Sequence, residues 1–232
     1  NNIKKDVQFI NSYLIQAQQI LIERTSKSIS DLPAMIKGNQ PTDGGHFVLT
    51  LDDKEKLLRE SPSSEKFIKS YIGSSEFING NERWCLWIKD QDVSEAENIS
   101  FIKNRINEVA KVRSESTAPT TRDFTKGHHR FIQIQRHPKK AIIIPSVSSD
   151  KRNYVPIGFV DDNTVISNLA FAVYDYEVYL FGIISSKMHM VWTKTVAGRL
   201  GMGLRYSNVL CYNTFPFPQI TEKQKEEITE LV

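Results

Sequence analysis

The residues best suited to chemistry in this chain lie together in one late segment, residues 185–218. The segment holds four cationic side chains and a histidine among aromatic rings, hydroxyl groups and three glycines, and it ends in a proline-broken aromatic run. Lysine and arginine neutralise phosphate, and their donors also match the acceptors on guanine edges. The segment therefore predicts DNA recognition. The alternative is a buried amphipathic helix with a solvated basic face.

Arg205 is the strongest candidate for reading a base edge, because it follows a glycine-rich turn at which the backbone can approach a groove closely. An ion pair with a surface carboxylate is the alternative role. Met202 and Asn208 are further candidates for base contacts. Phosphate contacts, which set the register of a protein on DNA, are predicted for the remaining polar candidates. These candidates are Lys194, Arg199, Ser207, Lys151, Arg152 and Lys187. A solvated surface position is the alternative, and for Ser207 and Asn208 the alternative is the end of a turn.

The charge of the chain is unevenly distributed, although its formal net charge is only +3. Residues 111–212 hold 14 Lys and Arg against 7 Asp and Glu, whereas residues 1–110 hold 14 against 16. A basic central and late region beside a mildly acidic one predicts a directed cationic face. Nucleic acid is the commonest partner for such a face, and an acidic protein surface is the alternative.

The bulk composition is that of an ordinary globular protein, with 232 residues of which 40% are hydrophobic and 25% charged. No apolar run is long enough to span a bilayer, and no signal peptide is recognisable at the start. Cys85 and Cys211 each lie in an apolar run and are expected to be buried free thiols, which fits a reducing cytoplasm. Because the first residue is Asn1 and not methionine, we expect the chain to be either processed or, as we favour, cut from a longer protein.

Residues 94–113 give the clearest helix signal, because apolar residues recur there at three- and four-residue spacing, and Ser94 with Glu97 matches a capping box. His189 and Trp192 lie one helical turn apart and are assigned mostly to packing. Further helices are expected at about 51–58, from Ser63 or Ser64 to Gly73, and at 176–184, 187–200 and 221–232.

Strands are expected mainly in the middle of the chain. Asp161–Asn163 is interpreted as a hairpin turn between two of them. The pattern as a whole predicts an α+β fold with a mixed, twisted sheet as its core, central strands at about 131–174 and 205–212, and packed helices. The individual strands are expected at 83–88, 131–135, 141–145, 155–160, 164–174 and 205–212, with strand and irregular structure over 7–23.

The sequence lacks the usual catalytic signatures. A dinucleotide loop starting at Gly201 would need its third glycine at Tyr206. No Cys/His set has zinc spacing, no adjacent prolines form an amine-binding turn, and no Glu-x-Lys occurs. We therefore expect the chain to bind a partner and not to carry catalytic, cofactor-binding or metal-binding residues itself.

Several sequence pieces, in this order and spacing, carry a family resemblance. The late pieces are Met188-His189-Met190-x-Trp192, Gly198-Arg199-Leu200, Arg205-Tyr206-Ser207-Asn208 and Tyr212-Asn213-x-Phe215-Pro216-Phe217-Pro218. The earlier pieces are Asn11-Ser12-Tyr13-Leu14, Ile22-Glu23-Arg24, Gly38-Asn39 with Pro41 and Asp43-Gly44-Gly45, Phe77-Ile78-Asn79-Gly80, Arg83-Trp84-Cys85-Leu86-Trp87 and Tyr154-Val155-Pro156-Ile157-Gly158-Phe159. Together they resemble the target recognition domain of MmeI-like single-chain restriction–modification enzymes, which methylate adenine in DNA.

The resemblance implies that residues 1–218 are a DNA target recognition domain and that residues 219–232 begin a C-terminal helical segment. It implies a parent protein that is a site-specific adenine methyltransferase, with endonuclease activity left open. Double-stranded DNA and the methyltransferase domain of the same chain would be the partners, and S-adenosylmethionine would bind in that domain and not in this fragment. In the family, the segment that corresponds to Gly201–Leu204 reads bases. Here it holds no charged residue, which leaves readout to Arg205, Met202 and backbone groups.

Two alternatives remain open at this point. The chain could be a protein-interaction module that uses a basic face, or a small self-contained nucleic-acid-modifying enzyme.

Overall fold

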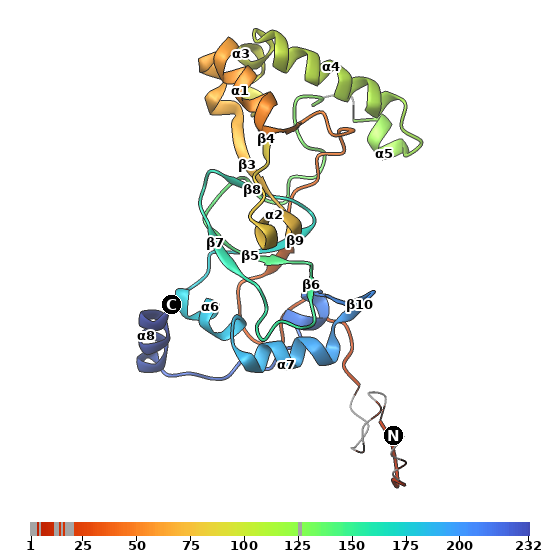
Figure 1. Cartoon of the computed structure of the whole chain (residues 1–232), viewed down its shortest axis with the longest axis vertical. Helices are drawn as coiled ribbons and strands as arrows, with labels where there is room; N and C mark the ends of the chain where they lie inside the picture. Colours follow the sequence, from red (N-terminus) through yellow and green to blue (C-terminus); the bar gives the residue numbers. More distant parts are fainter. Residues whose placement is uncertain (1–3, 5, 12–13, 15, 17–20, 125–126) are drawn as a thin grey trace.

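The computed structural model describes residues 4, 6–11, 14, 16, 21–124 and 127–232 of the chain. Strands occupy the middle of the molecule, and most helices gather at the two ends of its long axis (Figure 1). This is an α+β fold, as the sequence predicts. The strands are β1 (Met35–Lys37), β2 (Val48–Leu49), β3 (Ile68–Ile72), β4 (Trp84–Leu86), β5 (Ala141–Pro145), β6 (Val147–Ser149), β7 (Gly158–Val160), β8 (Thr164–Ile166), β9 (Ala170–Tyr174), β10 (Gly198–Leu200) and β11 (Gly203–Arg205). The α-helices are α1 (Leu51–Glu60), α2 (Ser74–Asn79), α3 (Val93–Glu97), α4 (Ser100–Ser114), α5 (Pro119–Arg122), α6 (Val178–Ile184), α7 (Lys187–Val196) and α8 (Glu222–Leu231).

The central sheet has the strand order β1-β9-β5-β7, and all its neighbouring strands are antiparallel. β5 and β9 form its middle, where Ile143 pairs with Ala172. Every residue of these two strands is buried. Strands covered on both faces have nearly continuous apolar sequences, which is why the sequence predicts both of them.

Residues 164–174 form two strands in place of the single strand predicted from their apolar run. β8 pairs in parallel with β3 in a second sheet of order β2-β4-β3-β8. The backbone then turns at Ser167, whose amide donates to the Ile72 carbonyl at 2.8 Å, and continues as β9 in the central sheet. The predicted hairpin at Asp161–Asn163 is wrong for the same reason, because β7 pairs with β5 while β8 pairs with β3.

Gly38 lies where these two sheets meet, and the junction requires a residue without a side chain. A Cβ atom on Gly38 would lie 2.3 Å from the carbonyl oxygen of Ser167 and 2.4 Å from that of Ile166. The Gly38 amide donates to Ala170 at 3.0 Å, and the Asn39 amide donates to Ile166 at 2.7 Å. The close approach of this backbone segment therefore holds the two sheets together.

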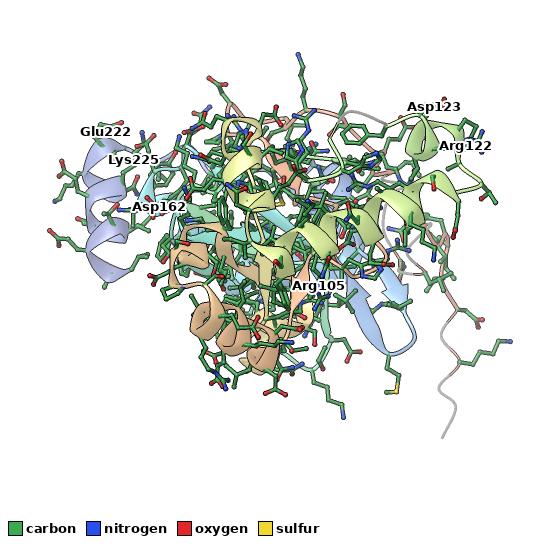
Figure 2. The ribbon with its side chains drawn as sticks, turned by 90° about the horizontal axis from the view of Figure 1, so that it is seen from above. Arg105, Arg122, Asp123, Asp162, Glu222 and Lys225 are labelled. Carbon is green, nitrogen blue, oxygen red and sulfur yellow. The ribbon has the colours of Figure 1, made fainter. Side chains whose placement is uncertain are left out.

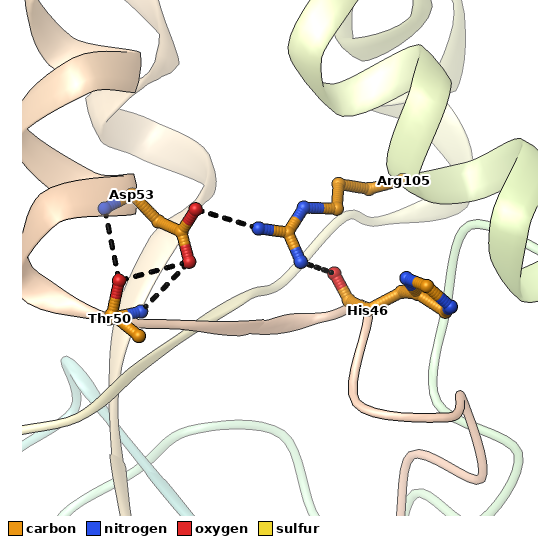
Figure 3. Close-up of polar contacts among 4 residues, drawn as sticks. All are labelled: His46, Thr50, Asp53 and Arg105. Carbon is orange, nitrogen blue, oxygen red and sulfur yellow. Dashed lines mark hydrogen bonds and ion pairs between the residues drawn. The ribbon is translucent and has the colours of Figure 1, made fainter.

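A separate hydrophobic core fills the end of the molecule that carries α1, α3 and α4. α1 begins with a capping box, in which the Thr50 hydroxyl accepts from the Asp53 amide and the Asp53 carboxylate accepts from the Thr50 amide. Arg105 of α4 donates to the same carboxylate at 2.8 Å and to the His46 carbonyl at 3.4 Å (Figure 3). One arginine thus ties α4 to the start of α1.

The helix predicted over residues 94–113 is divided in two. Ile99 adopts an extended conformation, with φ −92° and ψ 109°, so α3 ends before it and α4 begins after it. Ser94 lies inside α3 and makes no capping box, so that part of the prediction is wrong. The apolar spacing is nevertheless informative, because the residues that it identifies in α4 are buried.

Residues 131–135, all of which the structure describes, form no strand. This segment makes one isolated antiparallel β-bridge, between Gln133 and Gln40. Near its end, the side-chain oxygen of Asn39 accepts a hydrogen bond from the Gln135 amide at 2.8 Å. The Asn39 side chain therefore accepts backbone hydrogen bonds that a neighbouring strand would accept in a sheet.

The helix predicted from Ser63 or Ser64 to Gly73 is also wrong. Pro62–Phe67 forms a 3₁₀ turn, and the following residues form β3 between β4 and β8. A short apolar run fits either a helix or a buried strand, and here pairing on both sides decides.

Over residues 7–23 the described positions form no strand, and Ser12 and Tyr13 of the earliest motif lie outside the described residues. Both cysteines are free and buried, as predicted. In the part of the chain that the structure describes, no helix has the length and apolarity needed to cross a membrane.

α8 packs on α6 at the edge of the molecule, across from α4 and α5, and carries Glu222 and Lys225 (Figure 2). Lys225 lies 3.0 Å from the Glu222 carboxylate and 3.8 Å from that of Glu177. Ile228 covers Gly182 of α6, where a Cβ atom would lie 2.5 Å from the isoleucine side chain. α8 is therefore held against α6 by the apolar contact of Ile228 and by the Lys225–Glu177 ion pair, whereas the Lys225–Glu222 pair lies within α8 itself.

Arg113, in the last turn of α4, is completely buried. Its guanidinium donates to the backbone carbonyls of Pro41, Thr42, Gly127 and Arg130 at 2.7–3.0 Å. Burial lowers the pKa of Arg113 to about 10, so the side chain stays protonated at neutral pH. One cation therefore holds two loops against the end of a helix.

We expect Arg113→Met to lower the free energy of unfolding by about 3–5 kcal/mol, because it leaves several buried carbonyls without a donor. Arg113→Lys, which keeps the charge but offers fewer donors, should lose less. The control Arg59→Met, at an exposed position of α1, should change stability by no more than about 0.5 kcal/mol. Urea denaturation measures all three, and equal effects at residues 113 and 59 would contradict the structural role of Arg113.

Candidate nucleic-acid interface

α7 is the platform of the candidate site. It begins at a cap in which the Ser186 hydroxyl accepts from the His189 amide at 3.1 Å. His189 and Thr193 lie on its buried face. The helix ends at Val196, earlier than the predicted end at residue 200, because Ala197 is extended with φ −67° and ψ 147°. The next residues can therefore enter a sheet.

The segment that follows α7 is a β-hairpin made of β10 and β11. Its loop has two residues, Gly201 and Met202, and Gly201 has a φ of +58°. Glycine as the first residue of a two-residue hairpin loop is the pattern of a type II′ turn, which matches the twist of the flanking strands. The glycine-rich sequence therefore builds a tight turn that projects Met202 at its tip.

A third strand, β6, extends the hairpin into a sheet of order β10-β11-β6. β6 runs antiparallel to β11, with Arg205 opposite Val147. The loop that follows β6 carries Lys151 and Arg152, both of them exposed. Two segments far apart in the sequence thus place cationic side chains on one small sheet, near the end of the molecule that carries α7 (Figure 1).

The two faces of this sheet differ. Leu204 is 1% exposed and belongs to the hydrophobic core beneath the hairpin, so its face is turned inward. Because side chains alternate along a strand, Arg205 and Leu200 lie on the outer face. Arg199 pairs with Leu204 on the edge strand, and its guanidinium lies 3.6 Å from the carboxylate of Asp150. The two arginines therefore leave the hairpin on different sides.

Tyr206 fixes the base of the hairpin. It is buried, its amide donates to the Ser146 carbonyl at 2.9 Å, and its hydroxyl lies 3.0 Å from Nε2 of His189. The imidazole of His189 meets the ring of Phe215 edge to face, with centroids 4.6 Å apart. Burial lowers the pKa of His189 to about 3, so the ring is neutral at physiological pH. His189 is therefore a packing residue that ties α7 to β11.

Most of the predicted DNA contacts lie on this sheet or next to it. Met202, at the tip, is 79% exposed. Lys194 is exposed in the last turn of α7, just before β10. Lys187 starts the same helix and so lies about 10 Å from Lys194 along its axis. The residues at the sheet are Lys151, Arg152, Lys194, Arg199, Met202 and Arg205.

Ser207 and Asn208 lie at the base of the hairpin. The strand predicted over residues 205–212 is wrong beyond Arg205, because Asn208–Tyr212 forms one π-helical turn. Ser207 and Asn208 are both half-buried, and the side-chain amide of Asn208 donates to the Met35 carbonyl at 2.9 Å. The structure gives Asn208 a structural hydrogen bond, and the DNA contacts of these two residues stay predictions.

Two residues of this surface were not singled out from the sequence. Asp150 directly precedes Lys151 and Arg152, and a carboxylate beside two cations is the signal that could have identified it. Leu200 belongs to the Gly-Arg-Leu motif. Because the helix was predicted to extend to residue 200, the strand Gly198–Leu200, in which side chains alternate between two faces, was not expected there.

Comparison with solved structures identifies the class of fold. A structure of the type IIL restriction–modification enzyme MmeI in complex with DNA matches with a TM-score of 0.90 and 39% identity, covering 97% of this chain and 30% of that one. The type IIG restriction endonuclease BpuSI matches with a TM-score of 0.54 at 12% identity, over 87% of this chain and 25% of that one, which shows a shared fold alone. The chain thus has an α+β fold found within restriction enzymes.

Sequence comparison identifies the family. The family model "MmeI, target recognition domain" matches residues 16–219. DNA methyltransferase A of Bacillus subtilis (strain 168) is 39% identical over 229 residues, which are 99% of this chain and 26% of that protein. The chain belongs to the MmeI target recognition domain family, so the resemblance read from the sequence is confirmed. It spans about a quarter of the length of this relative.

The buried His189 should make stability depend on pH. In the unfolded chain its imidazole has a pKa near 6.5, whereas in the folded chain the pKa is about 3. The unfolded state therefore binds more protons in this window, so the contribution to stability is complete above pH 6.5 and falls by about 1.4 kcal/mol per unit as the pH drops. His189→Gln keeps a hydrogen-bonding side chain for the Tyr206 hydroxyl but cannot titrate.

Between about pH 7.5 and 5, we expect the wild type to lose about 2 kcal/mol more of its free energy of unfolding than His189→Gln. Urea unfolding at the two pH values measures the difference. Equal losses in the two proteins would contradict the buried, neutral state of His189.

Proposed function

We propose that this chain recognises a specific sequence in double-stranded DNA on behalf of a restriction–modification adenine methyltransferase. The observation that carries the proposal is the sheet of β10, β11 and β6, which gathers cationic side chains from two distant segments around a projecting hairpin. The major groove is wide enough to admit a two-stranded β-ribbon. The matched structure of MmeI, solved in complex with DNA, supports the same kind of partner for this chain.

Within this proposal, Arg205 reads a base edge from the outer face of the hairpin. A guanidinium can donate two hydrogen bonds to O6 and N7 of guanine. Arg199 binds phosphate, because an exposed ion pair such as the one with Asp150 is weak and a phosphate can replace the carboxylate. The other proposed contacts are Met202 and Asn208 to bases, and Lys194, Lys151, Arg152, Ser207 and Lys187 to phosphates.

The chemistry of methylation belongs, in this proposal, to a methyltransferase domain of the same polypeptide outside this chain. S-adenosylmethionine bound in that domain would supply the methyl group, and the target adenine would be taken out of the base stack. This chain would hold the duplex in register. Its coverage of 26% of DNA methyltransferase A and 30% of the MmeI chain supports a parent of similar length.

We also propose that residues 1–218 are the recognition domain and that residues 219–232 begin a helical segment. The end of the family match at residue 219 supports this boundary. We further propose a cytoplasmic location, which the match to a bacterial DNA methyltransferase supports.

An apolar groove of about 890 Å³ supports contact with the rest of such a parent. It lies between α6, α7 and α8, and Trp192 and Phe215 belong to its wall. Met188 is 70% exposed there and Leu231 87%. Contiguous exposed apolar surface of this kind is typical of an interaction site. We therefore assign the groove to the methyltransferase part of the parent, on a surface separate from the hairpin tip.

The affinity of the chain for duplex DNA should fall steeply as the salt concentration rises, because bound cations release counterions from the phosphates. Lys151→Ala should lower the slope of log K against log salt by about one, since it removes one phosphate contact. Lys223→Ala, an exposed control on α8, should leave the slope unchanged. Fluorescence anisotropy with a labelled duplex between about 50 and 200 mM salt measures the slopes, and a salt-independent affinity would sink the proposal.

Arg205→Ala should relax specificity at one base pair by about 1–3 kcal/mol, because it removes a side chain that reads a base edge. Arg152→Ala should instead weaken binding to all sequences alike. Selection from a randomised duplex pool, followed by sequencing, compares the two variants. If Arg205→Ala also weakens every sequence equally, Arg205 contacts phosphate and reads no base.

A further inference from the structure

The tip of the hairpin presents apolar side chains where a base reader is expected. Between Arg199 and Arg205 no residue has a polar side chain. Leu204 is buried, while Leu200 is 57% exposed and Met202 is 79% exposed. Solvent at the tip therefore meets a leucine, a methionine and the backbone of the turn.

The outer face of the hairpin carries few side chains. Leu200 lies opposite Gly203, and Arg205 lies opposite Gly198. On this face the two strands thus present one apolar and one cationic side chain, each with a glycine as its partner. Gly203 also packs tightly against β6, where a Cβ atom would lie 3.1 Å from the Ser148 carbonyl. Glycine at these positions allows the hairpin backbone to come close to a ligand.

We infer that Leu200 and Met202 form an apolar reader that recognises the C5-methyl group of thymine in the major groove. This inference rests on the proposed function. Among the groups that bases display in that groove, the thymine methyl is the one that an apolar side chain can contact favourably. A G·C pair at the same position would lose water from its donors and acceptors without gaining a hydrogen bond from either side chain.

The geometry also limits how far apart the two specified base pairs lie. Diagonal neighbours across an antiparallel pair, such as Leu200 and Arg205, are separated by about 7–8 Å. Successive base pairs rise by about 3.4 Å. On a ribbon laid along the groove, the thymine read by Leu200 therefore lies within about two steps of the guanine read by Arg205.

The test starts from the duplex that this chain selects from a randomised pool. Each thymine of that duplex is then replaced, one at a time, by deoxyuridine, which lacks only the methyl group. We expect one position to weaken binding about fourfold, the value of one methyl group transferred from water. A C·G pair at that position should bind more weakly still, and 5-methylcytosine in the C·G pair should recover about the same fourfold.

Substitutions at the hairpin tip test whether Leu200 and Met202 cause the loss of affinity that follows removal of the thymine methyl group. In the double variant Leu200→Ala and Met202→Ala, the thymine and deoxyuridine duplexes should bind with equal affinity. Leu51→Ala removes a leucine that is 51% exposed at the start of α1, outside the hairpin, and should keep the full difference. Circular dichroism of each variant, matching the wild type, shows that the fold is intact.

The outcomes separate the two proposals. Failure of the chain to select any sequence would overturn the proposed function. Selection of a sequence in which no thymine methyl matters would overturn only the apolar reader. Equal weakening of both duplexes by the double variant would also overturn it, since the tip would then act as a wedge or a general contact.

Discussion

The proposed recognition surface depends on the burial of one residue, Tyr206, next to the exposed Arg205. A two-stranded hairpin has marginal stability in water by itself. Here the hydroxyl of Tyr206 is hydrogen-bonded to His189 inside the core, and its amide donates to the carbonyl of Ser146, the residue directly before β6. The same residue thus ties the hairpin to a helix and to a third strand. Because adjacent residues of a strand point to opposite sides, the burial of Tyr206 also turns Arg205 outward.

The roles proposed for the cations follow from the elements that hold each side chain. Arg205 rises from a strand whose next residue is fixed in the core, so its position is well defined. Lys151 and Arg152 lie in a loop, and Lys194 lies near the end of a helix, where a long side chain can follow a phosphate. Phosphate contacts tolerate such freedom, since they position the protein without carrying sequence information, whereas base contacts require a fixed geometry. The rigid member of the set is therefore the one suited to specificity.

Much of the fold class could be predicted from the sequence, and most errors have one cause. Apolar runs identify buried segments such as Ala141–Pro145, but they do not say which segments pair. Residues 164–174 form two strands because the first part pairs with β3 and the second with β5, in different sheets. Residues 205–212 form a strand only up to Arg205 and then a π-helical turn. The cationic candidates at the hairpin were found from residue type. The arrangement that unites them with Lys151 depends on β6, whose three residues give no local signal.

In the hairpin, the exposed residues of the tip are different from the buried residues that stabilise it. Gly201, at the turn, has open space around it, since a Cβ atom there would meet no described atom within 4 Å. Leu200 and Met202 are exposed, so neither contributes much buried surface to the core. Leu204 and Tyr206, a few residues away, are buried and hold the hairpin in place. Because the side chains that would meet the bases and the side chains that hold the fold are different residues, the side chains of the tip can change while the same backbone continues to present them.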